Sequence, residues 1–590
     1  MTRRAAIAAP NPSATQAGLH ALGAGGNAVD AAIAAMITAT STEPGIVSPL
    51  AGAFINVWPA DGDPVVIDGN VEMPGRGADP ARFGSGLIEC VTTYGGGLTT
   101  YAGPGSVATP GMFSGMGLAH ERFGAAPWSE ILEVAATITA DGFQMSHTAA
   151  SYFEITADTI FAWDEQTRAL YTDDATAWPA GHTIRDDNLV AALRQIGEEG
   201  AASVYTGGLA ERIVADLAER GGLITARDLA EYRPVVRTPL RTSMAGWDLA
   251  ANPPPAIGGA VLTAMLRSLG DVSERVSPAH AARVMKDVLD LRLHRVDVAE
   301  DLEAAGHELL ETIATMGAVG LPTSQDTAHV SAVDDEGNAC AITASSGYGS
   351  GMYVGGTGML GNNALGEPEL NRRGLHALAP GTRLASNMAP TTARHADGTV
   401  LSIGTPGADR ITTALLQVLV HFCLHDETLQ YAVDAPRLHV RHLDEGGVRI
   451  DHEESPELLE ALTGLVGRST GEVVPLFAHG RHAMYFGGVG AAPCHRKGAQ
   501  DQRQPDPEQK NLPVMRIDHA RRITAAVPDI ESDIVYARKI LVDLQGFRLV
   551  VSGFDAITVS ILGVTGHCLF KPDVAVAATL PEMKDRKSVV

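Results

Sequence analysis

The sequence predicts a mixed α and β protein, with helical patterns in the first half and alternating strand patterns after residue 327. In GGNAVDAAIAAMITAT, Asn27 stands at a helix N-cap position and Asp30 follows three residues later, and the apolar residues around them predict a buried helix. From Ala328 the period changes, because AHVSAVD and ACAITAS each alternate and the DEGN between them favours a tight turn. The two segments therefore predict a β-hairpin that begins directly after Thr327.

Further elements follow from spacing and from helix-ending residues. A helix is predicted over Gly208–Gly221, and Thr225 is placed to cap a short helix at ARDLAEY. A second strong helical pattern covers Arg283–Leu302. The segment Gly347–Gly366 is rich in glycine and is predicted to be a loop that a ligand can approach closely. Its GxGxxG at 356–361 is not interpreted as a dinucleotide site, because no helical pattern follows it.

Length, charge and cysteine spacing limit the classes of function. A chain of 590 residues is longer than a single hydrophobic core usually supports, which predicts several lobes or one large layered domain. The net charge of −25 disfavours nucleic acid and anionic membrane surfaces as partners, since both require clustered lysine and arginine. The N-terminus carries no apolar run of secretory length, and the five cysteines are widely spaced without a CxxC pair. We therefore expect a cytoplasmic protein without a disulfide framework.

Several ordered segments together resemble the γ-glutamyltransferase family of N-terminal-nucleophile hydrolases. They are GGNAVDAAIAA, PGMFSGMGLAHERFGAAPWSEILEVA, GGLITARDLAEYRPVVRTPLR, NPPPAIGG, DTAHVSAVDDEGNACAIT, GNNALGE, RLASNMAPT and GTPGADRITTALLQ. The resemblance implies a four-layer αββα sandwich and a precursor that cleaves itself into two non-covalently associated subunits. The large subunit would span 1–326 and the small one 327–505, with 506–590 as an extension of unknown role.

The resemblance places the cut between Asp326 and Thr327, since Thr327, His329 and Ser331 match the family's T-x-H-x-S segment. The chemistry of a chain-terminal threonine supports this choice. Its hydroxyl is a weak nucleophile that needs a base, and its own α-amine, with a pKa of about 8, can take the proton. Attack on an amide would then give an acyl-Thr327 intermediate, which passes to water or to an amine.

Other catalytic positions are also implied by the resemblance. Gly407 and Ala408 in GTPGADR match the backbone N–H groups that stabilise the oxyanion of the tetrahedral intermediate. Ser345, at the end of ACAITASS, matches the second hydroxyl that hydrogen-bonds the nucleophile. An ordinary turn at 407 and an ordinary strand end at 345 are the alternatives.

The substrate pocket departs from the family pattern. Asn70 stands where the family has an arginine that binds the glutamyl α-carboxylate, and Arg76 nearby is a possible substitute. Glu367 matches the acid that holds the α-amine, with Gly347 in place of a nearby asparagine. The last two matched positions are those of the family's serine pair, Ser386 and Asn387.

The sequence thus predicts an amidohydrolase or acyltransferase of γ-glutamyl type that acts on a small-molecule amide without a cofactor. An acylase or small-amide hydrolase with a non-glutamyl pocket is one alternative, and a catalytically degenerate binding homologue is another. No metal is expected, because the pair His421 and His425 lacks the acid of an HExxH motif. The acidic run DHEES at Asp451 is interpreted as a solvated helix start.

Overall fold

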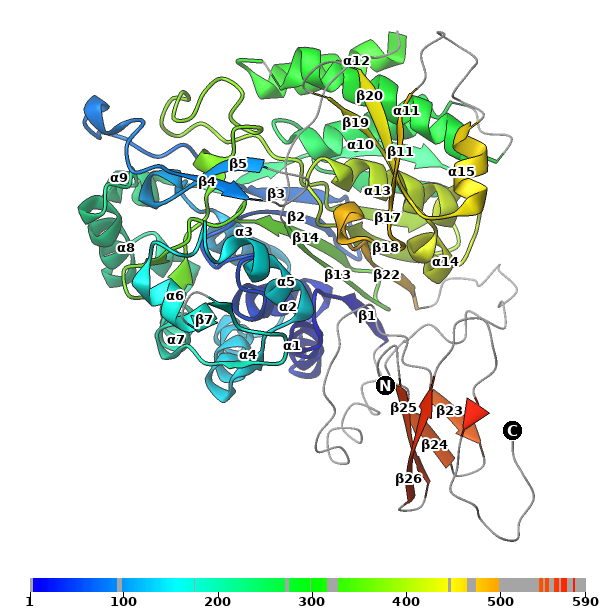
Figure 1. The fold of residues 1–590 in the computed structure, drawn as a ribbon, viewed down its shortest axis with the longest axis horizontal. Helices are drawn as coiled ribbons and strands as arrows, with labels where there is room; N and C mark the ends of the chain where they lie inside the picture. The colour runs from blue at the N-terminus through cyan, green and yellow to red at the C-terminus, as the bar shows by residue number, and fades with distance from the viewer. Residues whose placement is uncertain are drawn as a thin grey trace.

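Two antiparallel β-sheets face each other at the centre of the molecule (Figure 1). The computed structural model describes residues 4–92, 98–173, 176–270, 275–297, 299–315, 327–443, 447–463 and 474–497, together with the backbone of five short strands between 541 and 578. In the first sheet the strand order is β1 (Ala5–Ala8), β13 (Ala328–Asp334), β14 (Ala339–Ser345), β2 (Gly52–Trp58), β3 (Val65–Gly69) and β10 (Val235–Arg237). In the second it is β11 (Leu240–Met244), β12 (Trp247–Ala251), β17 (Thr391–His395), β18 (Thr399–Gly404) and β22 (Gly490–His495).

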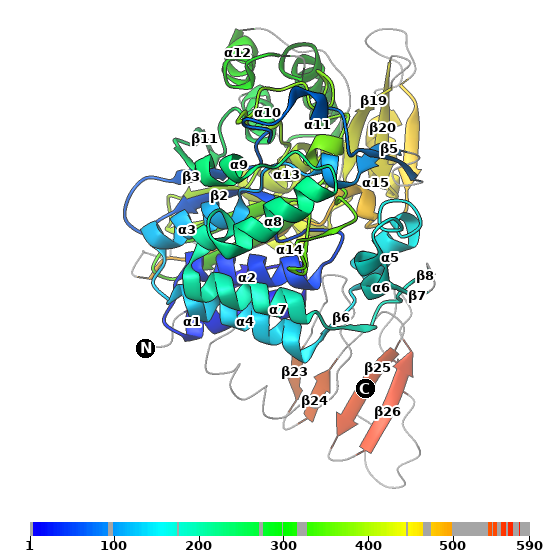
Figure 2. The same ribbon diagram turned by 90° about the vertical axis from the view of Figure 1, so that its left-hand side faces the viewer.

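Helices cover the outer face of each sheet (Figures 1 and 2). The first sheet is covered by α2 (Ala28–Thr42) and α3 (Met112–Phe123), with α1 (Pro12–Gly23), α4 (Trp128–Asp141) and α7 (Asp187–Glu199) packed beside and beyond them. The second sheet is covered by α10 (Ile257–Ser268) and α13 (Arg410–Leu419), with α11 (Pro278–Leu291) and α12 (Leu302–Thr315) packed against α10. The order helix, sheet, sheet, helix is the predicted four-layer αββα sandwich, and that expectation is confirmed.

The hairpin of β13 and β14 lies near the middle of the first sheet, with β1 on one side and β2 on the other. Its turn is fixed by Asp334, whose carboxylate accepts N–H bonds from Glu336, Gly337 and Asn338 at 3.0–3.1 Å. The same carboxylate accepts the amide of Ala28 at the start of α2. Because the turn sets the register of both strands, it also sets the position of the residue that precedes β13.

The two faces of β13 have different surroundings. Val330 and Ala332 pack into the core beneath α2, whereas Val333 packs between the two sheets against strands of the second sheet. Successive side chains on a strand point to opposite faces. The odd-numbered residues from 327 to 333 therefore belong to the face that looks toward the second sheet.

The predicted helices near Asn27 and Thr225 are confirmed. Asn27 and Asp30 form a capping box at the start of α2, and Thr225 forms another with Asp228 at α9 (Ala226–Glu231). The pattern over Gly208–Gly221 corresponds to α8 (Gly208–Glu219). At α2 and α9 the capping side chain satisfies backbone N–H groups that would otherwise lack a partner, whereas α8 starts at Gly207 without a side-chain cap.

The single helix predicted over Arg283–Leu302 is wrong in its bounds. The helix α11 begins earlier because Ser277 caps it, and it ends in a π turn, η5 (Arg292–Val296). Arg292 there binds Asp297 at 3.1 Å, and Asp301 caps the separate helix α12. Caps at both boundaries divide the helical pattern into two helices.

Smaller elements surround the sandwich. A helical lobe contains α5 (His147–Thr156) and α6 (Glu165–Tyr171), and a three-stranded sheet contains β19 (Leu438–His442), β20 (Val448–Glu453) and β21 (Leu476–His479). The interpretation of DHEES as a solvated helix start is wrong for Asp451, His452 and Glu453, which are buried in β20, and α15 (Pro456–Thr463) begins only after them. The remaining short strands and helices are β4 (Ile88–Thr92), β5 (Leu98–Ala102), β6 (Phe143–Gln144), β7 (Thr172–Asp173), β8 (Thr176–Ala177), β9 (Thr183–Ile184), β15 (Tyr353–Val354), β16 (Met359–Leu360) and α14 (Leu429–Asp434).

Towards the C-terminus, the described strands form an antiparallel sheet of their own. They are β23 (Leu541–Leu544), β24 (Phe547–Val550), β25 (Ala556–Ile561), β26 (Val564–Leu569) and β27 (Ala577–Ala578). Within the described residues, no helix has the length and apolar character needed to cross a membrane.

Candidate active site

Thr327 lies directly before β13, on the face of the first sheet that looks toward the second, and it is only 4% exposed. In the β13–β14 ladder Ala328 pairs with Ala344, so the register sets Thr327 opposite Ser345. Ser345 pairs in turn with Gly52 on β2. The proposed nucleophile and the proposed second hydroxyl are thus cross-strand neighbours, while Asp326 lies outside the described residues.

His329 joins three strands beneath Thr327. Its Nδ1 lies 2.8 Å from the Thr343 hydroxyl on β14, and its Nε2 lies 2.8 Å from the Ser331 hydroxyl. Ser331 donates its proton to the carbonyl of Gly490 on β22, so it accepts a hydrogen bond from Nε2–H, and Nδ1 accepts one from Thr343. Burial lowers the pKa of His329 to about 3. The ring is therefore neutral, and both of its nitrogens are used.

The loop of Gly407 and Ala408 starts against this histidine. A Cβ atom on Gly404, the last residue of β18, would lie 2.3 Å from Cε1 of His329. Only glycine fits there, because such a separation is far below van der Waals contact. The loop after Gly404 therefore begins on the same inter-sheet face that carries Thr327.

Gly407 and Ala408 both have a positive φ, of 120° and 58°. Their carbonyls accept the amides of Arg410 and Ile411 at 3.0 and 3.2 Å, which turns the chain into α13. Within the described part of the chain, neither of their own N–H groups donates a hydrogen bond. Two successive free amides next to a helix N-terminus form a site suited to a negatively charged oxygen.

Asn70, the predicted substrate-binding residue, is 3% exposed and already hydrogen-bonded. Its amide nitrogen donates to the carbonyl of Leu384 at 2.9 Å. Its oxygen lies against Gly52, where a Cβ atom would be 2.7 Å away. Asn70 thus packs beside Gly52, the strand partner of Ser345, and its hydrogen bond to Leu384 joins the end of β3 to the chain at that residue.

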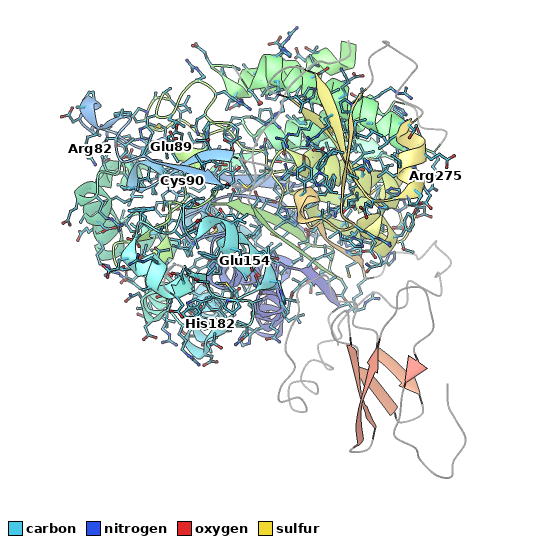
Figure 3. The ribbon with its side chains drawn as sticks, in the orientation of Figure 1. Arg82, Glu89, Cys90, Glu154, His182 and Arg275 are labelled. Atoms are coloured by element: carbon cyan, nitrogen blue, oxygen red, sulfur yellow. The ribbon has the colours of Figure 1, made fainter. Side chains whose placement is uncertain are left out.

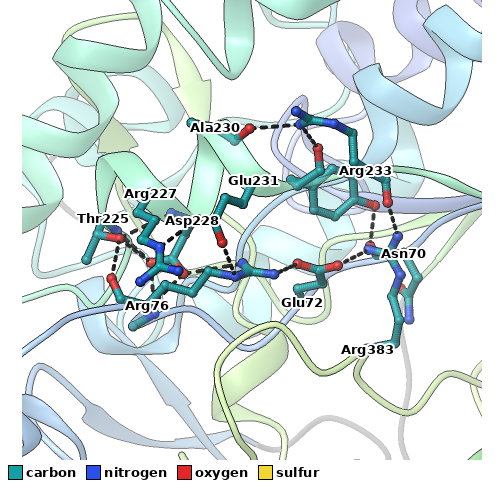
Figure 4. A network of polar contacts seen from close by, with 12 residues as sticks. Asn70, Glu72, Arg76, Thr225, Arg227, Asp228, Ala230, Glu231, Arg233 and Arg383 are labelled. Atoms are coloured by element: carbon teal, nitrogen blue, oxygen red, sulfur yellow. Dashed lines mark hydrogen bonds and ion pairs between the residues drawn. The ribbon is translucent and has the colours of Figure 1, made fainter.

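The possible substitute Arg76 is bound by three carboxylates (Figure 4). It contacts Glu72 at 2.9 Å, Asp228 at 3.5 Å and Glu231 at 3.4 Å. Two of these acids are buried, and separating a buried carboxylate from its cation is costly. The structure therefore gives no support to Arg76 as the carboxylate-binding residue.

Arg383 is a second arginine beside Asn70, and the sequence analysis missed it. Its guanidinium donates to the carbonyls of Asn70 and Arg233, pairs with Glu72 at 3.1 Å and stacks on the ring of Tyr232 at 4.5 Å (Figure 4). Arg383 is held by these partners, and its bond to the carbonyl of Asn70 holds the backbone there in place. The signal for it was its place in RLASNMAPT, one of the matched segments.

Glu367 and Gly347 lie against each other. A Cβ atom on Gly347 would be 2.6 Å from Oε1 of Glu367 and 2.2 Å from Oδ1 of Asn363. The backbone of Gly347 also has a φ of 58° and donates its amide to Ser345. The longer acid at 367 therefore fills the space that a side chain at 347 would need, next to the end of β14.

Ser386 and Asn387 border the start of α10. The carbonyl of Ser386 accepts the amides of Ile257 and Gly258 at 2.9 and 3.1 Å. A Cβ atom on Gly258 would lie 1.9 Å from the carbonyl of Asn387. This close approach explains the first glycine of the final pair in NPPPAIGG, and a Cβ atom on the second, Gly259, would lie 1.9 Å from the carbonyl of Asn252.

The pair His421 and His425 has an acid after all. Ligand atoms of His421, His425 and Glu427 lie within 4.8 Å of one another, since Asp426 adopts a left-handed φ of 53° and turns Glu427 back. His421 lies 2.6 Å from Glu427, which also binds Arg275 at the outer edge of the molecule (Figure 3). The amide of Val276 donates to Nε2 of His425. Hydrogen bonds and an ion pair account for this arrangement.

The chain is similar to known proteins over most of its length. A family model described as gamma-glutamyltranspeptidase matches residues 14–296 and 269–506. The chain belongs to the γ-glutamyltranspeptidase family. The acylase ACY 1 proenzyme of Pseudomonas sp. (strain SE83) is 30% identical over 528 residues, which cover 84% of this chain and 92% of the relative. The glutathione hydrolase proenzyme of Escherichia coli (strain K12) is 28% identical over 498 residues, covering 77% and 84%.

The fold of this γ-glutamyltranspeptidase family member matches a solved relative as well. The cephalosporin acylase from Bacillus halodurans superposes with a TM-score of 0.64 at 24% identity, covering 84% of this chain and 94% of that one. The family membership identifies the chain as a self-processing N-terminal threonine amidohydrolase or acyltransferase. The family resemblance of the sequence is thereby confirmed.

Proposed function

We propose that this γ-glutamyltranspeptidase family member cuts its chain between Asp326 and Thr327 and then cleaves an amide through an acyl-Thr327 intermediate. The position of Thr327 carries the proposal: it precedes a central strand, faces the space between the sheets and lies opposite Ser345. A nucleophile held by a strand paired on both sides keeps its geometry. After the cut, the new α-amine would stand on the reacting residue itself.

The base in this mechanism is the α-amine of Thr327. Within the described residues, the nearest histidine along the strand is His329, and both of its ring nitrogens are bonded to Thr343 and Ser331. Its pKa of about 3 also leaves it a poor proton acceptor near neutral pH. An α-amine with a pKa of about 8 can accept the hydroxyl proton and later return it to the leaving amine.

The negative oxygen of the tetrahedral intermediate would be bound by the free N–H groups of Gly407 and Ala408. Such donors contribute about 3 to 4 kcal/mol each to the transition state when they are already in place. Ser345 would hold the Thr327 hydroxyl from the neighbouring strand. Water or an amine then takes the acyl group from Thr327.

The acyl group is proposed to differ from γ-glutamyl. At residue 70 an arginine clamp is replaced by an amide that already donates to Leu384, and the nearby Arg76 and Arg383 are held by acids and carbonyls. A carboxylate bound there would lose a charged hydrogen bond worth about 1.5 to 3 kcal/mol. The similarity to the acylase proenzyme agrees with an acylase-type substrate.

A cytoplasmic location remains a prediction.

Self-cleavage is tested by gel electrophoresis of the purified protein. We expect two chains, with Thr327 as the first residue of the smaller one by N-terminal sequencing. Thr327→Ala should stay one intact chain, and Thr327→Ser should be cut slowly, because serine keeps the hydroxyl. An uncut wild-type protein, or a cut that persists in Thr327→Ala, would refute the proposal.

The acyl group is tested with three anilides that release the same dye: γ-glutamyl, glutaryl and acetyl. We expect acetyl release to exceed both γ-glutamyl and glutaryl release in kcat/KM, because the latter two acyl groups carry the same terminal carboxylate and acetyl carries none. Dominant γ-glutamyl turnover would refute the acyl assignment but leave the mechanism intact. A processed protein that binds acyl amides without releasing dye would instead indicate the degenerate binding homologue.

A further inference from the structure

The acid that follows the Gly407–Ala408 amides has an unusual position. Asp409 occupies the N-cap of α13, where an aspartate normally accepts a backbone N–H, yet its side chain makes no cap bond. It is 5% exposed, and its carboxylate points instead to Arg410 at 2.7 Å and to Nε2 of His439 at 3.3 Å. The carboxylate of Asp409 therefore does not cap the helix; it contacts two side chains instead.

His439 holds Asp409 from a separate sheet. It lies on β19, is 1% exposed, and its Nδ1 is 3.0 Å from the hydroxyl of Thr413 on α13. Since Thr413 donates its proton to the carbonyl of Arg410, it accepts a hydrogen bond from Nδ1–H of His439. The imidazole thus bridges the first turn of α13 and the carboxylate before it.

Arg410 is held just as firmly. Its guanidinium stacks on the ring of Tyr485 at 4.2 Å and donates to the carbonyl of Tyr485. Tyr485 in turn donates to the buried Asp451 at 2.5 Å. Burial opposes the charge on Asp409, but Arg410 and His439 together keep its pKa below the usual value. The carboxylate is therefore ionised and fixed by two neighbours that are themselves fixed.

The positive groups around Asp409 also matter for the charge near the oxyanion. A bare carboxylate one residue from Ala408 would repel a developing oxyanion, and low dielectric would strengthen the repulsion. Arg410 beside the carboxylate offsets that charge, and Arg292 adds a further positive charge nearby. The acid can therefore anchor the loop without opposing the reaction.

We propose that Asp409 is a positioning residue that, through its contacts with Arg410 and His439, holds the Gly407 and Ala408 amides in line for the oxyanion. Ala408 needs such an anchor because a non-glycine residue with a φ of 58° is strained. This inference rests on the proposed oxyanion role of the two amides. It adds to that role a specific support, made by residues of α13 and β19.

The test compares Asp409→Asn, His439→Gln and the double variant with the wild type, using whichever anilide the wild type cleaves. Rates are expressed per processed chain, as counted by N-terminal sequencing. We expect kcat to fall about tenfold or more in each single variant with KM little changed, because the amides act mainly in the transition state. The double variant should be no slower than the worse single variant, since both remove one shared contact.

Controls separate positioning from folding and from the proposed function. Asp63→Asn makes the same exchange at a side chain that is 98% exposed and should leave kcat and KM unchanged. If Asp409→Asn fails to fold, Asp409→Glu and His439→Gln decide, with partial kcat expected for the former. Unchanged kcat in folded Asp409→Asn, a rise in KM alone, or additive losses in the double variant would overturn the inference. A wild type that is never cut would instead refute the proposed function.

Discussion

His329 makes the pH dependence of folding predictable. The usual histidine pKa is 6.5, and burial lowers that of His329 to about 3. Between these values the unfolded chain binds a proton that the folded chain does not, so stability falls as pH decreases from about 6.5 toward 3. At pH 5 the loss is about 2 kcal/mol, because each pKa unit corresponds to about 1.4 kcal/mol.

The perturbation is His329→Gln, which keeps one donor and one acceptor but does not titrate. The assay is urea unfolding at pH 7 and pH 5, followed by tryptophan fluorescence. Both proteins also carry Thr327→Ala, so that each unfolds as one uncut chain. The free energy of unfolding of the variant should be lower at pH 7, and the gap to the parent should narrow by about 2 kcal/mol at pH 5.

The control for general acid effects is the parent itself, because all other groups titrate equally in both proteins. A gap that stays the same within about 0.5 kcal/mol at both pH values would mean that His329 is not held neutral in the fold. The neutral bridge from Thr343 to Ser331 would then be the wrong description, and His329 would again be a candidate base.

Three further predictions concern other buried groups. Burial raises the pKa of Glu43 from 4.5 to about 7, so Glu43→Gln should gain about 2.5 kcal/mol relative to wild type between pH 5 and pH 8, measured by urea unfolding; a constant difference would contradict this. Gly347→Ala should lower stability by about 1 to 3 kcal/mol and reduce activity, and adding Glu367→Asp should recover part of both; no recovery would mean that the two residues do not compete for space. Arg383→Met should cost about 1.5 to 3 kcal/mol, read as a lower melting temperature, because it removes one of two cations from the buried Asp68 and Glu72; an unchanged melting temperature would show that Arg237 and Arg76 are sufficient for these acids.

The local elements were predictable from the sequence wherever a side chain marks a boundary. Asn27 and Thr225 both cap helices as expected, and the DEGN turn sets a hairpin that begins after Thr327. The layered arrangement of the sheets was available only through family resemblance, because pairing between strands distant in sequence leaves no local pattern. The misplaced helix at Arg283–Leu302 shows the same limit, since its π turn depends on the Arg292–Asp297 contact.

The residues of the candidate site could be named from the sequence, but the contacts that support them could not. Thr327, Ser345 and Gly407 follow from matched motifs, whereas the partner of His329 required the hairpin register, which pairs it with Thr343. Arg383 was missed because its partners come from distant segments. The acidic run at Asp451 was misassigned because burial against Tyr485 and Arg449 is a tertiary property.

The strand order of the two sheets has a consequence for a chain that is cut before Thr327. The hairpin of β13 and β14 belongs to the later piece, yet it lies between β1 and β2 of the earlier piece. In the second sheet, β12 of the earlier piece pairs with β17 of the later one. Three strand pairs would thus join the two pieces: β1 with β13, β2 with β14, and β12 with β17. Breaking one peptide bond would create a new chain end while these strands stay paired. Such a molecule can change its covalent structure at its centre without ever coming apart, and neither piece could complete either sheet alone.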